Sequence, residues 1–541
     1  MTLSNHARLE VHLPPLAERT VAAVMRQALE RVPDKLAVRD LHRALTYRAL
    51  VDEALGLAGA VADLGVGRQE AVLMMLDNHV DFISLWLALS LTARIETPVN
   101  TGYRGPILAH VIRNSGAEVM VVEAAYLERL GEIPEALEAI ETVVVRGEGR
   151  EVPLPGHIRV IRLEALQARP VPIEDVKPWD IIGILYTSGT SGPSKGALIP
   201  HAQAYGYATP EVTAATVAND VALVALPLFH ITAQWGAVYN AFIAGSSAVV
   251  LPRFSATTFW DTAREYACTK AAVLGTVAQF LFAQPPRPDD RTQPIRKMGM
   301  SPVIPEIDAF MARFGIEGVT TGYGSTEIST VACARPGQAV PGQAGYLRSD
   351  FEARLVDEHD VDVGPGEAGE LIVRPTEPWT IMAGYVGMPE ATAKAWRNLW
   401  FHTGDLLRQA DNGQLIFCDR TNDAIRRRGE NISSFEVERE VDSHPAVLES
   451  AAIKAPSDHT DDEVKVCVVI RDGETLTADD LLAHVRARLP AFMVPRYVEF
   501  MDALPKTPTQ KVLKAQLRQD SLNPRTWDSV RRTFAGGAKA V

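Results

Sequence analysis

Serine and threonine residues, glycines and a lysine are concentrated in one short stretch of the chain, and together they could bind phosphate. The stretch is YTSGTSGPSKG, residues 186–196, with three glycines, five serine or threonine hydroxyls and Lys195. Glycines let backbone amides point at an anion, hydroxyls add donors, and the lysine adds a mobile positive charge. This predicts a phosphate-binding loop, although a Gly- and Ser-rich surface turn with a solvated lysine would have the same composition.

The order of residues in this loop excludes the P-loop of nucleotide-hydrolysing enzymes. That motif requires G-x-x-x-x-G-K-[ST], in which the hydroxyl after the lysine holds magnesium. Here Ser194 precedes Lys195 and Gly196 follows it. A plain phosphohydrolase would also need a water-activating base near the γ-phosphate, and we find no such arrangement. The loop is therefore not a P-loop, and its composition alone leaves the surface turn open.

An apolar strand must position the loop. Residues 182–186 are apolar enough for a buried strand, so the loop lies at a strand end, where α/β proteins bind ligands. Along the first part of the chain, short apolar runs alternate with helical periodicity, which predicts α/β layers with largely parallel sheets. The expected strands are residues 71–76, 119–122, 143–145, 221–226 and 248–251, and the expected helices include 21–32 and 80–91.

The sequence pattern changes from about Gln343. From there, short strand-like runs are separated by Gly, Pro and Asp turns, which predicts a β-rich subdomain. After Arg420 we expect a small α+β unit. We therefore predict two domains, residues 1–419 and residues 420–541. The strands expected in this half are 351–356, 369–373, 413–418, 447–453 and 464–470, and the helices are 434–441 and 478–489.

Length and composition indicate a soluble multidomain protein. A chain of 541 residues exceeds a single core, and 47% hydrophobic with 22% charged residues is typical of globular proteins. The net charge of −13 argues against nucleic acid as the main ligand, and no apolar run is long enough to span a membrane. Four cysteines without a CxxC pair fit a reducing compartment. We expect a cytoplasmic protein, monomeric or dimeric.

The loop resembles the signature of one family. Residues 187–196 match [ST]-S-G-[ST]-[ST]-G-x-[PS]-K-G at every position, the signature of the adenylate-forming superfamily of acyl-CoA synthetases, peptide-synthetase adenylation domains and firefly-type luciferases. Two of the later strings, RRRGENISSFEVE and TPTQK, look similar to a bacterial branch that includes crotonobetaine/carnitine-CoA ligase-like proteins. The further matching motifs, in the family's order, are GYGSTE (322–327), WFHTGD (400–405), DRTNDAIRRRGENISSFEVE (419–438) and LPKTPTQKVLKAQLR (504–518).

The resemblance implies a role for each motif in binding ATP and Mg²⁺. Glu327 would bind Mg²⁺, and Asp405 would accept hydrogen bonds from the ribose hydroxyls. Arg420 would lie near the ribose of the nucleotide. Within the second motif, Tyr323 would stack on adenine and Thr326 would touch phosphate. The residues implied to hold phosphate are Thr187, Ser188, Gly189, Thr190, Ser191, Gly192 and Lys195, and those implied to hold the nucleotide are Gly322, Tyr323, Gly324, Ser325 and Thr326.

Three further residues receive roles from the same resemblance. His230, in LPLFHITA, would alone be read as a core histidine, but by resemblance it lies beside the acyl site and gates the carboxylate. Lys511 would bridge the substrate carboxylate and the α-phosphate. Gly429 would let the pantetheine arm of coenzyme A pass close to the backbone. Candidate residues for the acyl pocket are Trp235, Tyr239, Gly275, Phe280, Met300, Ser301 and Ser329.

The implied activity is that of an ATP-dependent acyl-CoA ligase. A carboxylic acid would form acyl-AMP with release of pyrophosphate, and coenzyme A would then take the acyl group with release of AMP. The alternative is a stand-alone adenylating enzyme that loads a carrier-protein phosphopantetheine, which would share every motif. A non-catalytic nucleotide-binding regulator need not retain Lys511 and Glu327, and both are present.

Two positions depart from the family's pattern. The resemblance implies a mobile C-terminal domain that rotates about a hinge, where Asn422 stands in place of the usual Asp or Lys. Asparagine tolerates unusual φ/ψ, so rotation is still expected. Gln510 replaces the glycine that usually precedes the final lysine, while the charge of Lys511 is retained.

Overall fold

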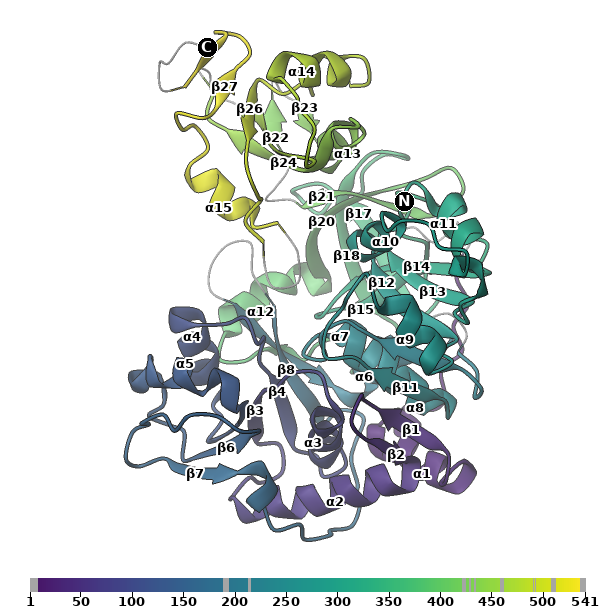
Figure 1. Cartoon of the computed structure of the whole chain (residues 1–541), viewed down its shortest axis with the longest axis vertical. Helices are drawn as coiled ribbons and strands as arrows, with labels where there is room; N and C mark the ends of the chain where they lie inside the picture. The colour runs from purple at the N-terminus through teal and green to yellow at the C-terminus, as the bar shows by residue number, and fades with distance from the viewer. Residues whose placement is uncertain are drawn as a thin grey trace.

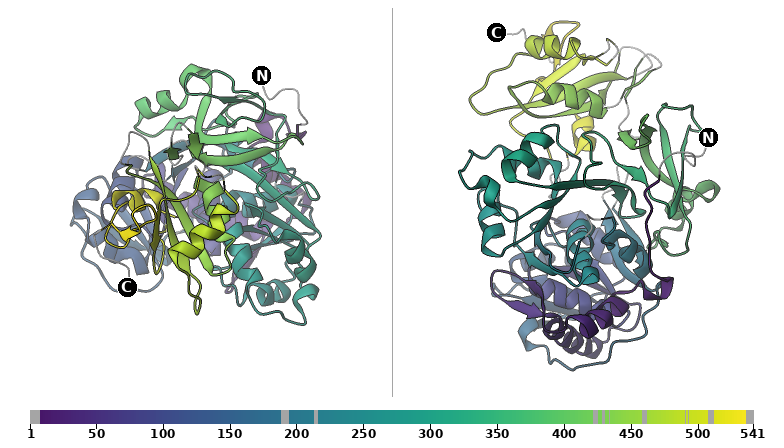
Figure 2. Two further views of the ribbon diagram at one scale, coloured as in Figure 1. Left: turned by 90° about the horizontal axis from the view of Figure 1, so that it is seen from above. Right: turned by 90° about the vertical axis from the view of Figure 1, so that its right-hand side faces the viewer.

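The chain folds into layered α/β sheets, a smaller antiparallel sheet and a C-terminal α+β domain, which confirms the predicted fold class (Figure 1). The right-hand view of Figure 2 shows that the C-terminal elements lie at one end of the long axis. This computed structural model describes residues 8–187, 194–212, 216–420, 425–427, 430–432, 434–457, 462–489, 491, 493–506 and 512–535.

The first large sheet has the strand order β19-β9-β8-β4-β3-β5-β6-β7. The strands from β8 to β7 are parallel, and β9 and β19 add antiparallel pairs at one edge. The strands are β3 (Ala71–Met75), β4 (Ile95–Pro98), β5 (Val119–Glu123), β6 (Thr142–Arg146), β7 (Arg159–Arg162), β8 (Ile181–Thr187), β9 (Lys195–Pro200) and β19 (Gly384–Tyr385). The associated helices are α2 (Tyr47–Asp63), α3 (Val80–Ser90), α4 (Gly105–Ser115), α5 (Leu127–Gly131) and α6 (His201–Ala208).

The second large sheet has the order β16-β15-β14-β13-β12-β10-β11-β1-β2 and is parallel from β14 to β1. Its strands are β1 (Leu36–Arg39), β2 (Ala44–Thr46), β10 (Val221–Val224), β11 (Ser247–Val250), β12 (Lys270–Leu274), β13 (Lys297–Ser301), β14 (Gly318–Ser325), β15 (Ser329–Ala334) and β16 (Tyr346–Leu347). Its helices are α1 (Val21–Arg31), α7 (Ile231–Ala233), a π-helical turn (Gln234–Tyr239), α8 (Asn240–Ala244), α9 (Phe259–Glu265), α10 (Gly275–Phe282) and α11 (Ile307–Phe314).

Helix α3 explains how the two large sheets share one core. Its sequence VDFISLWLALS is apolar on nearly every side, and all of its residues except Asp81 are buried. A helix that is hydrophobic all round must be covered all round. Its side chains belong to one core cluster with Val72 of β3 and Val250 of β11. The helix therefore packs in a single core that the two sheets share.

The predicted β-rich subdomain is an antiparallel sheet with the order β17-β18-β20-β21. The C-terminal domain follows with its own hydrophobic core, whereas the predicted boundary between residues 419 and 420 stays a prediction. The strands are β17 (Phe351–Val356), β18 (Gly369–Pro375), β20 (Phe401–Gln409), β21 (Leu415–Arg420), β22 (Ile425–Arg427), β23 (Glu430–Ile432), β24 (Val447–Ala455), β25 (Glu463–Ile470), β26 (Tyr497–Phe500), β27 (Trp527–Asp528) and β28 (Thr533–Phe534). The helices are α12 (Pro389–Ala395), α13 (Ser434–Asp442), α14 (Ala478–Arg486) and α15 (Lys514–Gln519).

The expected elements differ from the observed ones mainly at their ends. The helix expected over residues 478–489 ends at Arg486, three residues earlier than expected. The strand expected over 221–226 ends at Val224. Within the described ranges, the helices are too short or too polar to cross a membrane.

Candidate active site

The predicted phosphate loop connects two antiparallel strands. β8 and β9 pair so that Thr187 lies opposite Lys195, at the end of the hairpin where the loop leaves the sheet. The loop residues Ser188, Gly189, Thr190, Ser191 and Gly192 lie outside the described residues. The structure therefore places the two ends of the predicted loop side by side, at the carboxyl end of a central strand.

A second hairpin, formed by β14 and β15, presents Glu327 to the first one. Its turn is held from two sides: Gln203 of α6 donates from Nε2 to the carbonyl oxygens of Thr326 and Glu327 at 2.8 and 3.1 Å, and the Met382 amide donates to the Glu327 carbonyl at 2.9 Å. Ser329 adopts a left-handed backbone with φ of +65° to close the turn. The backbone position of Glu327 is thus fixed by contacts to the carbonyl groups of the turn.

Gly324 is required for this turn, and alanine there should destabilise the protein. A Cβ at position 324 would lie 2.0 Å from the Ser329 carbonyl oxygen, so backbone would have to move. We expect Gly324→Ala to lower the free energy of unfolding by about 1–3 kcal/mol in urea titrations. Gly206→Ala in α6 is the matched control, because nothing lies within 4 Å of its added Cβ and alanine favours helix. A Gly324→Ala protein as stable as wild type would contradict this account.

The carboxylate of Glu327 meets the phosphate hairpin directly. Its Oε1 atom accepts hydrogen bonds from the hydroxyls of Thr187 and Tyr385, both at 3.2 Å. The Lys195 ammonium lies 5.0 Å from the centre of the Tyr385 ring. A cation, a carboxylate and two hydroxyls therefore converge at the strand ends of both large sheets.

The ring of Tyr323 and two charged side chains of the antiparallel sheet form a neighbouring cluster. The Tyr323 hydroxyl donates to Oδ2 of Asp405 at 2.6 Å, and Nε of Arg420 lies 3.4 Å from Oδ1 of the same carboxylate. Asp405 and Arg420 are paired across β20 and β21, so the sheet register fixes them together. Burial, and then the Asp405 charge, raise the pKa of Tyr323 well above its usual value, which keeps its hydroxyl a donor.

His230 begins the helical segment that lies between β10 and β11 in the chain. It precedes α7 and the π-helical turn, and its ring lies 4.6 Å from that of Phe229. π-Helical turns often occur at functional sites. Four residues after His230, Gln234 donates from Nε2 to Oε2 of Glu96 at 2.7 Å, and both side chains are completely buried. The polar pair ties the His230 segment to β4 of the first sheet.

Burial of Glu96 raises its pKa from 4.5 to about 8, so its carboxyl is largely protonated at neutral pH. Between these two values the folded protein holds a proton that the unfolded chain has released, so the free energy of unfolding should fall as the pH rises. The contribution of Glu96 is fully present below about pH 4.5 and lost above about pH 8. We expect Glu96→Gln to remove this part of the pH dependence in urea titrations, and an unchanged pH profile would contradict it.

The predicted acyl-pocket residues are spread over several elements: Gly275 follows β12, Met300 and Ser301 end β13, and Ser329 begins β15, whereas Trp235 and Tyr239 lie in the π-helical turn. Ser301 Oγ accepts from the Gly322 amide at 3.2 Å and lies 3.1 Å from Thr321 Oγ1, which joins β13 to the GYGSTE strand. The Phe280 side chain is 45% exposed, so the structure does not place it in a buried wall. The other predicted pocket residues are buried or half-buried: Trp235, Tyr239, Gly275, Met300, Ser301 and Ser329.

The predicted catalytic lysine and thiol-channel glycine are not covered by the structure. Lys511 and Gly429 lie outside the described residues, as do Asn422 and Gln510. The segment around Lys511 is bracketed by an antiparallel bridge between Lys506 and Val512. The predicted roles of these four residues therefore remain predictions.

A buried polar cluster joins the last strand of the antiparallel sheet to the C-terminal domain. Asp419 accepts from the Ser434 amide and hydroxyl at 2.5 and 3.1 Å. Lys514 in turn donates to the Ser434 hydroxyl and lies 2.7 Å from Oε1 of Glu438. Burial raises the pKa of Asp419 and of Glu438. We call these four residues the hinge cluster, because they flank the predicted hinge on both sides.

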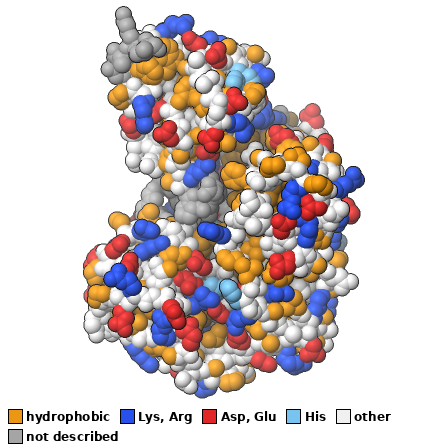
Figure 3. Space-filling view, in the orientation of Figure 1, with side chains coloured by type: hydrophobic (Ala, Val, Ile, Leu, Met, Phe, Trp, Pro, Cys, Tyr) orange, Lys and Arg blue, Asp and Glu red, His pale blue; other side chains and the backbone are white. Residues whose placement is uncertain are grey.

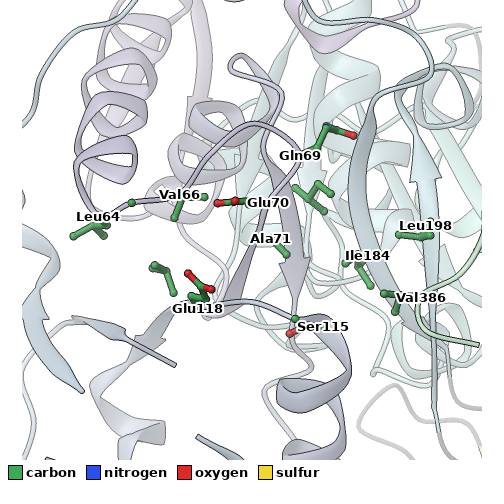
Figure 4. A pocket seen from close by; sticks show the side chains of 14 residues that line it. Leu64, Val66, Gln69, Glu70, Ala71, Ser115, Glu118, Ile184, Leu198 and Val386 are labelled. Carbon is green, nitrogen blue, oxygen red and sulfur yellow. The ribbon is translucent and has the colours of Figure 1, made fainter. Parts of the chain in front are cut away.

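A cavity of about 330 Å³ lies elsewhere in the first sheet (Figure 4). Its lining includes Ala71, Ile95 and Val119, the first residues of β3, β4 and β5, together with Glu70 and Glu118. It therefore lies at the amino ends of these strands, whereas the phosphate hairpin opens at the carboxyl end of β8, which runs parallel to β4. The cavity is separate from the candidate site.

Two family models match most of this chain. A family model described as AMP-binding enzyme matches residues 25–386, and one described as AMP-binding enzyme C-terminal domain matches residues 436–511. The chain belongs to the AMP-binding enzyme family. As a member of this family it is an enzyme, an AMP-forming acid–thiol ligase.

The relatives of this AMP-binding enzyme include CoA ligases. Crotonobetaine/carnitine–CoA ligase of Salmonella typhi is 30% identical over 489 residues, which cover 88% of this chain and 93% of the relative. The protein of the same name from Salmonella heidelberg (strain SL476) is 31% identical over 493 residues with the same coverage. The predicted resemblance to the adenylate-forming superfamily and to this branch is confirmed.

Solved structures share the fold of this AMP-binding enzyme. The anthranilate CoA ligase AuaEII, in complex with anthranoyl-AMP, aligns with a TM-score of 0.83 at 22% identity, over 96% of this chain and 98% of that one. ATP-bound MatB from Rhodopseudomonas palustris aligns with a TM-score of 0.80 at 25% identity, over 92% and 98%.

Sequence reasoning missed several residues that hold the site of this AMP-binding enzyme together. Tyr385 contacts both Lys195 and Glu327, and Gln203 holds the Glu327 turn. The hinge cluster was missed as well, although Asp419, Ser434 and Lys514 fall within predicted motifs. The Gly384–Tyr385 pair of β19 is too short to show a strand periodicity, so only its Gly-Tyr sequence after an apolar run could have signalled it.

Proposed function

We propose that this enzyme is an ATP-dependent acyl-CoA ligase that forms an acyl-adenylate and then transfers the acyl group to coenzyme A. The observation that carries the proposal is the meeting of the phosphate hairpin with Glu327, next to the cluster of Tyr323, Asp405 and Arg420. Such an arrangement suits the phosphates, the divalent cation and the nucleoside of one ATP molecule. We assign this site, apart from Arg420, to a first domain, residues 1–419.

In the first half-reaction the substrate carboxylate attacks the α-phosphorus of ATP, and the bond from that phosphorus to pyrophosphate breaks. Because an anion must approach a polyanion, neutralisation of charge is the main requirement. Lys195 and the loop amides would hold the β- and γ-phosphates so that they leave as pyrophosphate. Lys511 would bridge the carboxylate and the α-phosphate and so align the reacting atoms.

The residues at the turn fit Mg²⁺. This ion takes oxygen ligands and is commonly held by one or two carboxylates together with substrate phosphates. Glu327 offers a half-buried carboxylate whose orientation is set by two hydroxyl donors. In the described part of the chain there is no cluster of three or more acidic, histidine or cysteine side chains that would hold a metal alone. When bound, Mg²⁺ would neutralise charge on the phosphates.

The nucleoside would lie against the antiparallel sheet. A carboxylate such as Asp405 can accept two hydrogen bonds, which suits the two ribose hydroxyls, and Arg420 supplies a donor beside it. The bond from the Tyr323 hydroxyl to Asp405 would orient the ring for stacking on adenine. Gly322, Ser325 and Thr326 would line the phosphate side of the same strand.

In the second half-reaction the thiol sulfur of coenzyme A attacks the carbonyl carbon of the acyl-adenylate. A C–S bond forms, the bond to the AMP oxygen breaks, and the thiol proton is released. The C-terminal domain, proposed as residues 420–541, would rotate about Asn422 to admit the thiol past Gly429. Such a rotation would separate Asp419 from Ser434 in the hinge cluster.

We propose a modest-sized carboxylic acid as the acyl substrate, with His230 gating the carboxylate. The relatives at 30–31% identity are named for crotonobetaine and carnitine, and the structure with the same fold carries anthranoyl-AMP. The pocket candidates combine bulky Trp235 and Tyr239 with small Gly275 and Ser329. We further propose a cytoplasmic location, since the four cysteines are widely spaced and form no CxxC pair. On the face seen in Figure 3, basic side chains are interspersed with acidic ones.

Mass spectrometry of the purified protein with ATP, Mg²⁺ and a panel of carboxylic acids tests the proposal. Each acid is measured with and without coenzyme A. The expected result is AMP, pyrophosphate and an acyl-CoA from at least one acid. An acyl-adenylate that accumulates regardless of coenzyme A would overturn the proposal in favour of a carrier-protein acceptor.

A further inference from the structure

We infer that Tyr385 is a positioning residue that keeps Lys195 and Glu327 apart, so that one serves phosphate and the other the metal ion. This inference rests on the proposed function of the site. Tyr385 contributes two different surfaces, a hydroxyl and a ring face, and each engages one of the two oppositely charged side chains.

The hydroxyl of Tyr385 orients the carboxylate. It donates to Oε1 of Glu327 at 3.2 Å, and Thr187 donates to the same oxygen at the same distance. A phenol is protonated at neutral pH, so the hydroxyl can act as a donor. With two donors on Oε1, the carboxylate is turned so that Oε2 is the oxygen left for a cation.

The ring of Tyr385 holds the lysine without neutralising it. The Lys195 ammonium lies 5.0 Å from the ring centroid, within the range of a cation–π contact. Lys195 and Glu327 both contact Tyr385, yet no ion pair joins these two described side chains. Opposite charges in a partly buried site attract strongly, so without the ring they would be drawn together. A direct ion pair would compete with phosphate for the lysine and with the metal ion for the carboxylate.

The backbone around Tyr385 is built to hold it in this place. Tyr385 is paired with Ala197 across β19 and β9, two residues from Lys195. Its amide donates to the Thr392 hydroxyl of α12 at 2.9 Å. The tyrosine is 9% exposed. Its position is therefore set by the same strand that carries Lys195, independently of Glu327.

Two substitutions distinguish the role of the Tyr385 hydroxyl from that of its ring. Tyr385→Phe keeps the ring and removes the hydroxyl, whereas Tyr385→Leu removes both. Binding of Mn²⁺, a spectroscopic substitute for Mg²⁺, is measured by electron paramagnetic resonance in the presence of α,β-methylene-ATP. Binding of the metal-free analogue is measured by calorimetry. The Tyr385→Phe protein should bind Mn²⁺ about tenfold more weakly, with unchanged affinity for the metal-free analogue. Tyr385→Leu should weaken both.

Tyr126→Phe is the matched control. Tyr126 also donates its hydroxyl to a carboxylate, Asp77, at 2.6 Å, and its ring lies 4.3 Å from the guanidinium of Arg129, but it lies outside the site. This control should bind Mn²⁺ and the analogue as wild type does. Wild-type affinity for Mn²⁺ in Tyr385→Phe, or equal weakening of metal and metal-free binding in that variant, would overturn the inference. If the wild-type protein binds no metal–nucleotide complex, the proposed function fails and this inference fails with it.

Discussion

Replacing Lys511 with alanine is expected to lower the rate of acyl-adenylate formation by about 100-fold or more, while thioester formation from preformed acyl-adenylate continues. The physical reason is that the lysine would neutralise and align two anions only in the first half-reaction. The first rate is measured by exchange of labelled pyrophosphate into ATP. The second is measured by mixing synthetic acyl-adenylate with coenzyme A.

Lys506→Ala is the control for the loss of a lysine in the same region. Lys506 lies on the other side of the bridge to Val512, and its ammonium pairs with Glu449. It should leave both half-reactions near their wild-type rates. Equal loss of both half-reactions in Lys511→Ala would show that one site performs both steps, contrary to the proposed two-step use of the C-terminal domain.

Glu327→Gln should lower adenylation by about 100- to 1000-fold. Glutamine has the same shape, and its amide oxygen can still accept the Thr187 and Tyr385 hydroxyls, so the turn should keep its conformation. What is lost is the negative charge that would hold Mg²⁺ beside the phosphates. The measurement is the rate of adenylate formation as a function of Mg²⁺ concentration, with the half-saturating concentration expected to rise.

Glu352→Gln is the matched control for this change. Glu352 pairs with Arg374 on the surface of the antiparallel sheet, away from the candidate site. Its removal should change neither the rate nor the Mg²⁺ dependence, because exposed ion pairs contribute little. A Glu327→Gln protein with wild-type Mg²⁺ dependence would remove this residue from the metal site.

Local patterns predicted most of the elements, because strand and helix periodicity depends on near neighbours. The runs at residues 351–356 and 71–76 correspond to β17 and β3 almost residue for residue. The motif residues Thr187 and Glu327 were also identified, since each lies in a string that resembles its family's signature. Their contact, across 140 residues of chain, required the folded structure.

The residues that sequence reasoning missed share a physical reason. Tyr385 lies 58 residues from Glu327, and its strand is two residues long, so no periodicity marks it. Glu96 lies in a buried strand of only four residues, IETP, and its partner Gln234 lies 138 residues further on. Such contacts depend on how whole sheets pack together. A single sequence carries no local signal for them.

The three groups that converge at the candidate site come from three different sheets. Thr187 and Lys195 belong to the first sheet, Tyr323 and Glu327 to the hairpin of the second, and Asp405 with Arg420 to the antiparallel sheet. A small sliding of one sheet against another would therefore abolish nucleotide binding before any strand melts. Conversely, bound nucleotide should hold the three sheets together. It should therefore slow amide hydrogen exchange where the sheets meet and raise the melting temperature as the ligand concentration rises.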